Sequence, residues 1–194
     1  MTATKIAAFA GAALGLAAMA SATVQPNTYE IRVSNVVSPG TPSATVEVWA
    51  DWDSDLFYAF AAAEWSLRGD GTGDFSGPSS AFTDPGQDDG TPSGGDVLDI
   101  VTGQLQFPSG GIFADTSDPI LIWSATWSTT DFTARTVDLA TETARYNLYL
   151  DDTGLSSEVT ATVLEGAGRI EVIPAPASLA LLGLGGLAAA RRRR

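Results

Sequence analysis

Three aspartates that alternate along one short segment have the clearest capacity for chemistry: Asp51, Asp53 and Asp55. Calcium takes about six to eight oxygen ligands, and alternating carboxylates on one loop can supply three of them. The full calcium-loop pattern is absent, because Leu56 occupies the position of the turn glycine and no glutamate stands at the final position. The segment predicts either a calcium site, with calcium as the one candidate cofactor, or an acidic turn.

Two aromatic residues, Trp49 and Tyr149, are candidates for binding carbohydrate. Trp49 lies on the outer face of its strand if Val46 and Val48 point inward. An exposed aromatic ring beside acidic and amide groups can stack on the C–H bonds of a sugar. Aromatic rings also bury large areas in protein cores. Three further tryptophans are expected in the core: Trp65, Trp123 and Trp127.

Composition excludes several kinds of enzyme. The chain has no Cys and no His, and its only Lys is Lys5. These absences remove nucleophilic catalysis that depends on His or Cys, Schiff-base chemistry and the usual zinc sites. Paired carboxylates could run glycoside hydrolysis, but among 23 acidic residues some pair will meet the required spacing by chance. We therefore predict a protein that is not an enzyme.

The charge excludes another class of function. All 23 acidic residues lie between Glu30 and Glu171, and this segment contains five arginines and no lysine, which gives it a formal charge of −18. A surface this acidic repels phosphate backbones and anionic lipid, so nucleic acid is not an expected partner. The charge is consistent with a solvated surface or with cation binding.

Residues 1–22 have the features of a secretory signal peptide. Lys5 supplies the positive charge, Ile6 to Ala18 form an apolar run, and Ala20 and Ala22 fit the small-residue pattern of a cleavage site. The run is too short to be a stable membrane anchor. We expect the general secretion machinery to export the chain across the inner membrane.

The C-terminus has a second set of signals. Pro174 and Pro176 hold the chain extended, and the apolar run from Leu179 to Ala190 follows. As a helix that run would rise about 18 Å, which is short for a membrane span. Four arginines end the chain and are expected to stay cytoplasmic: Arg191, Arg192, Arg193 and Arg194.

This order of parts, over residues 172–194, resembles the PEP-CTERM sorting signal. The sequence departs from the family at Ala175, where the namesake motif has Glu. The resemblance implies a short transmembrane helix, transient anchoring and processing near Pro174, Ala175 and Pro176 by an exosortase-type membrane transpeptidase. It further implies display at the cell surface or in an extracellular matrix, with polysaccharide as an associated partner. The alternative is a plain membrane anchor that is retained.

Residues 23–171 alternate apolar and polar residues in many short segments separated by Gly, Pro, Asp and Ser. This pattern predicts an all-β domain, an antiparallel sandwich of two sheets with four or five strands each, flanked by a signal helix and a C-terminal apolar helix. The order of Val37–Gly40, Thr45–Val48 and Ile120–Trp127 is similar to that of cohesin and carbohydrate-module sandwiches. This similarity implies a fold and hardly constrains function.

Two stretches of the middle are less regular. Residues 56–67 have both helix-favouring alanines and strand-favouring aromatic residues, and we predict a strand with one smooth inner face. That face would contain Phe57, Ala59, Ala61, Ala63, Trp65 and Leu67. Residues 69–96 are rich in Gly and Asp and are predicted to form one long loop.

Together these features predict an exported, non-catalytic cell-surface or matrix protein, sorted through its C-terminal tail. A carbohydrate-binding module that uses Trp49 and Tyr149, with calcium as its candidate ion, is the alternative.

Overall fold

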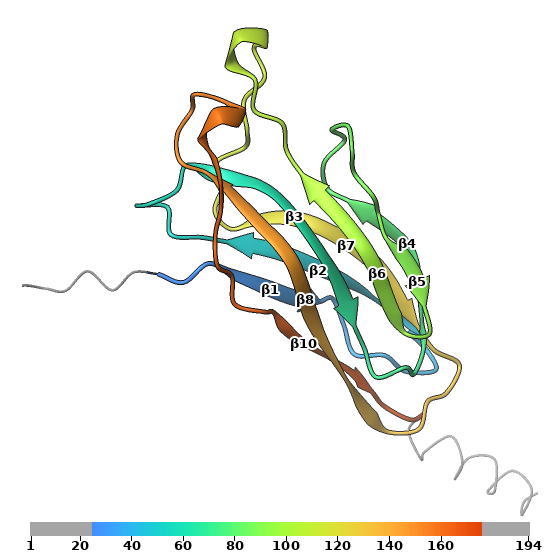
Figure 1. Ribbon diagram of the computed structural model, residues 1–194. Helices are drawn as coiled ribbons and strands as arrows, with labels where there is room; N and C mark the ends of the chain where they lie inside the picture. Colours follow the sequence, from blue (N-terminus) through green and yellow to red (C-terminus); the bar gives the residue numbers. More distant parts are fainter. Residues whose placement is uncertain (1–24, 176–194) are drawn as a thin grey trace, which may run out of the picture.

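The computed structural model describes residues 25–175 (Figure 1). The predicted signal peptide, with Ala20 and Ala22, therefore lies outside the described residues. So do Pro176, the apolar run and the arginines at 191–194, together with the two helices expected to flank the domain. Pro174 and Ala175 are described and are exposed.

The described chain folds into two antiparallel sheets (Figure 1). The four-stranded sheet has the order β1 (Thr28–Val33), β2 (Ser43–Asp51), β7 (Ile120–Ser128) and β4 (Asp74–Ser80). The six-stranded sheet has the order β10 (Ala167–Val172), β8 (Arg135–Tyr149), β3 (Ala59–Arg68), β6 (Asp96–Gly103) and β5 (Thr91–Ser93). In that sheet β9 (Glu158–Thr160) also pairs with β8, and two short 3-10 helices, η1 (Pro108–Gly110) and η2 (Leu155–Ser157), lie in connections. The predicted all-β sandwich is confirmed.

The core forms because alternate residues of facing strands point into the space between the sheets. Along β2, Ala44, Val46, Val48 and Ala50 are buried, while the residues between them are more exposed. Large aromatic rings fill the centre, and Trp65 meets Trp123 edge to face with ring centroids 5.5 Å apart. The three tryptophans expected in the core are at most 2% exposed, so that prediction is confirmed.

The strand predicted within residues 56–67 exists as β3, but its single smooth face does not. The pairing of β3 with β8 shifts between Phe60 and Ala62 and again between Glu64 and Trp65. Because each bulge changes which side chains face inward, Phe60 joins the main core. Ala59 and Ala61 instead pack with Ala114 and Tyr149 in a second, separate cluster.

The single long loop predicted for residues 69–96 is wrong, because this segment contains β4 and β5. Several of its glycines have positive φ, and Gly73 shows why glycine is needed. Gly73 has φ +101° just before β4, and a Cβ there would overlap Cζ2 of Trp127. The glycine-rich composition therefore reflects tight turns and close approach to the core, and the strands between the turns carry little apolar sequence to reveal them.

We predict that Gly73→Ala costs about 2–4 kcal/mol of unfolding free energy, because backbone strain and a clash with Trp127 add together. Gly86→Ala is the matched control, since Gly86 has φ +91° but a Cβ added there would have no heavy atom within 4 Å. It should cost only about 1–2 kcal/mol, the strain of the left-handed backbone alone. Urea unfolding of both variants measures the difference, and equal losses would show that the close packing against Trp127 is not what requires glycine.

Candidate functional site

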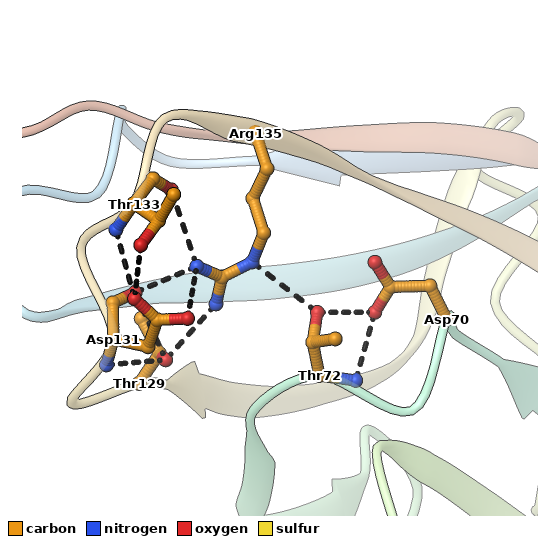
Figure 2. Close-up of polar contacts among 6 residues, drawn as sticks. All are labelled: Asp70, Thr72, Thr129, Asp131, Thr133 and Arg135. Carbon is orange, nitrogen blue, oxygen red and sulfur yellow. Dashed lines mark hydrogen bonds and ion pairs between the residues drawn. The ribbon is translucent and has the colours of Figure 1, made fainter.

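The end of the sandwich from which the C-terminal tail leaves is organised by Arg135, the first residue of β8 (Figure 2). Its Nη1 donates to the carbonyl oxygens of Asp131 (2.7 Å) and Thr133 (3.3 Å), and its Nη2 donates to Oγ1 of Thr129 (3.1 Å). Its Nε donates to Oγ1 of Thr72 (3.3 Å), across the sandwich. The guanidinium thus joins the loop before β4 to the loop between β7 and β8.

This arrangement uses the donors of Arg135 for protein contacts. The carboxylate of Asp131 lies 3.5 Å from Nη1, and hydrogen bonds from the backbone and side chain of Thr133 hold its pKa below the usual value. Asp131 is therefore ionised well into the acid range, and the contacts that need its charge persist until the pH falls through that lowered pKa. An arginine that makes four hydrogen bonds to the protein fixes loops and has little left to offer an anionic ligand.

The C-terminal tail begins inside this fold. Arg135 is the register partner of Val172, the last residue of β10. Val172 is 1% exposed and Ile170 is fully buried. On the other side of β10, the amide of Val37 donates to the carbonyl of Glu171 and the amide of Ile173 donates to the carbonyl of Val37, each at 2.9 Å. The chain is thus held through Ile173, and the exposed Pro174 follows directly.

Residues 172–194 match the PEP-CTERM protein-sorting motif. The chain carries a PEP-CTERM sorting signal. The resemblance predicted from the proline, apolar and arginine segments is therefore confirmed, and the motif begins at the last residue of β10. No curated protein matches the chain.

The sandwich is similar to cohesin modules. It matches the cohesin module of a family 33 glycoside hydrolase from Clostridium perfringens with a TM-score of 0.51 and 8% identity, over 77% of this chain and 98% of that chain. A type I cohesin–dockerin complex from Clostridium thermocellum matches at a TM-score of 0.48 and 16% identity, over 76% of this chain and 100% of that chain. At these identities the likeness concerns the fold alone.

The three aspartates proposed as calcium ligands lie at the opposite end from the tail, where β2 leads into β3. Asp53 is nearly buried, and its carboxylate accepts hydrogen bonds from the amides of Gln25 (3.0 Å) and Asp55 (3.1 Å). Asp51 accepts one from the side chain of Gln25. Within residues 25–175 no group of three or more acidic side chains is placed to hold a metal ion. The contacts that are present are those of a hydrogen-bonded turn.

Sequence spacing did not reveal the acidic residue that completes this turn. Asp118 accepts a hydrogen bond from the amide of Trp52 at 3.2 Å, although 66 positions separate them. Burial raises the pKa of Asp118, and the nearby carboxylates of Asp51 and Asp53 raise it further. Only the pairing of β2 with β7, which places Ala50 opposite Ile120, brings these residues together.

The two aromatic residues proposed to bind carbohydrate have different surroundings. Tyr149 is 1% exposed and donates from its hydroxyl to the carbonyl of Gln104 at 3.0 Å, so its expected place on the surface is wrong. The bulges of β3 and the chain around Ala114 cover it. Trp49 is partly exposed, but the guanidinium of Arg32 lies 4.2 Å from its ring centroid and its Nε1 donates to Glu47. One ring face of Trp49 is therefore already covered.

Within residues 25–175 no helix is long and apolar enough to cross a membrane.

We predict that Arg135→Ala lowers the unfolding free energy by about 1–3 kcal/mol and speeds amide hydrogen exchange in residues 70–74 and 129–133, because both loops lose their shared donors. The control is Arg169→Ala, whose side chain is 77% exposed and pairs only with Asp138. It should cost about 0–1 kcal/mol. Hydrogen exchange that stays slow in both loops would contradict the role of Arg135.

We predict that Asp53→Ala costs about 1–3 kcal/mol, because two backbone amides lose their acceptor. Asp55→Ala is the matched control, since Asp55 is exposed and contributes only its backbone to the turn. Thermal unfolding with and without calcium completes the test. A calcium-dependent rise in Tm that both variants abolish would contradict a purely structural turn and support a calcium site.

Proposed function

We propose that this chain is an exported, non-catalytic protein that an exosortase-type membrane enzyme processes at its C-terminus and that is then displayed at the cell surface or in an extracellular matrix. The observation that carries the proposal is the sorting motif at residues 172–194, directly joined to a folded sandwich. The predicted signal peptide supports export, and the absence of Cys and His from the sequence supports a role without catalysis.

The fold limits where such an enzyme can cut. A cut within β10 would break its pairing with β8 and uncover the core next to Ile170. The amide of Ile173 is also held by Val37. The cleavable segment therefore starts at Pro174, which is exposed and has no backbone N–H that the fold could hold. The five residues from Pro174 to Ser178 span at most about 18 Å, so the enzyme works close to the folded domain.

We predict that the mature protein from its native cells begins after Ala22 and ends between Pro174 and Ser178, and that its intact mass carries any group joined to the new C-terminus. Replacing all four terminal arginines by Ser should leave the tail attached, because the cytoplasmic charge that positions it is lost. Arg169→Ser is the control, since that arginine is exposed and lies outside the motif.

A wild-type mass that retains residues 179–194 would overturn the proposal and leave a plain membrane anchor. A mass that ends before Ile173 would contradict the limit set by β10.

A further inference from the structure

A second feature of the surface lies at the far end of the sandwich from the sorting tail. Two connections, 104–119 between β6 and β7 and 150–157 between β8 and β9, project there with η1 and η2, while β10 ends at the other extreme (Figure 1). We name their projecting parts, residues 107–113 and 150–155, the crest.

The crest exposes large apolar side chains. Nine such residues are exposed among residues 25–175, and five of them belong to the crest. Their exposed fractions lie between 42% and 61%: Phe107, Ile112, Phe113, Leu150 and Leu155. Single exposed apolar residues are ordinary, but five large apolar side chains exposed on two adjoining loops make the crest a candidate interaction site.

The two loops of the crest are fixed to one another. The side chain of Gln106 is fully buried and its Nε2 donates to the carbonyl of Asp151 at 2.8 Å. Gly154 lies so close that a Cβ there would be 3.2 Å from Cδ of Pro108. The hydroxyl of Ser157 donates to the carbonyls of Asp151 and Gly154. The apolar side chains therefore stand on loops that are already ordered before anything binds.

The base of the crest is held equally firmly by Gln104. Its Nε2 donates to the carbonyls of Phe60 and Asp115, and its Oε1 accepts from the amide of Asp115 at 2.7 Å. A buried polar network of this kind rigidifies what it supports, and an ordered surface loses less conformational entropy on binding.

The charged residues in the two segments that form the crest are all acidic. Segments 104–119 and 150–165 contain no Lys or Arg. Their acidic residues are Asp115, Asp118, Asp151, Asp152, Glu158 and Glu165. Hydrogen bonds from Ser117 and Thr153 lower the pKa of Asp115 and Asp151 respectively, so both are anionic at neutral pH. The arginine nearest to the crest residues 150–155 along the chain, Arg145, is paired with Glu64 at 2.6 Å.

We propose that the crest is a docking surface for a polypeptide partner that presents large apolar side chains bordered by Lys or Arg. Exposed apolar side chains on loops whose charged residues are all acidic are complementary to that chemistry and disfavour a second copy of the same crest or an anionic lipid surface. The crest also lies at the opposite end of the sandwich from the end of β10, where the sorting motif begins, so a domain held by its tail would present the crest outward (Figure 1). The proposal is independent of tail processing, because no crest residue belongs to the sorting motif.

The test uses a random peptide library displayed on phage and selected on the full-length chain in a mild detergent. We expect enriched peptides to combine Leu, Phe or Trp with neighbouring Lys or Arg. A synthetic copy of the strongest peptide should bind about tenfold or more weakly to the variant F113S/L155S, because two apolar anchors are lost. Its binding should also weaken as salt rises.

The matched control is L56S/L164S, because Leu56 and Leu164 are 53% and 54% exposed and lie outside the crest. Binding of the peptide to this control should be unchanged, and the Tm of both variants should equal that of the wild type. Failure to enrich any peptide, enrichment of acidic peptides, or equal loss in the two variants would overturn the proposal. Self-association of the wild type that F113S/L155S abolishes would also overturn it, in favour of a second copy.

Discussion

The packing of aromatic rings between two sheets is the interaction on which the rest of this structure depends. The chain has no Cys, so no disulfide shares the task. The ring centroid of Trp65 lies 5.5 Å from that of Trp123 and 5.8 Å from that of Tyr29, and Tyr29 lies 5.4 Å from Tyr146. This packing has a cost, because the indole nitrogens of Trp65 and Trp127 find no hydrogen-bond partner among the described protein atoms. Trp123 does donate, to the carbonyl of Asp89. The packing of the rings and the apolar area that they bury stabilise the fold more than the unpaired indole N–H groups destabilise it.

A rigid core of this kind allows the two ends of the sandwich to differ. Near the tail, Arg135 ties β8 to two loops and its strand partner Val172 ends the last strand. At the other end, the loops are held by uncharged side chains: the buried Gln104 and Gln106 hold the projecting loops through neutral hydrogen bonds. The loops near the tail are thus joined by the charged guanidinium of Arg135. The loops of the crest end contain acidic residues and no basic ones. The sheets between them keep the sorting signal and the crest apart.

The sequence was informative where side-chain type alone decides the outcome. Alternation around Val46 and Val48 predicted a strand with one buried face, and the large indoles predicted the core. It was uninformative where the backbone decides, as in the bulges of β3 and the glycine-rich strands β4 and β5. The burial of Tyr149 depends on such a bulge and on a loop about 35 positions earlier in the chain. The role of Asp118 depends on the pairing of β2 with β7, which no local spacing encodes.

The place of β10 in the chain also sets where the sorting motif separates from the fold. β10 is the last strand of the described chain, and it forms one edge of the six-stranded sheet. Its pairing with β8 runs from Ala167 to Val172 and covers buried residues such as Val137. The amide of Ile173 donates to the carbonyl of Val37, so Pro174 is the first residue of the motif without a backbone hydrogen bond to the described fold. The first residues of the sorting motif are therefore also the last residues of the sandwich, and the core that buries Val172 limits how much of the motif can be separated from the domain.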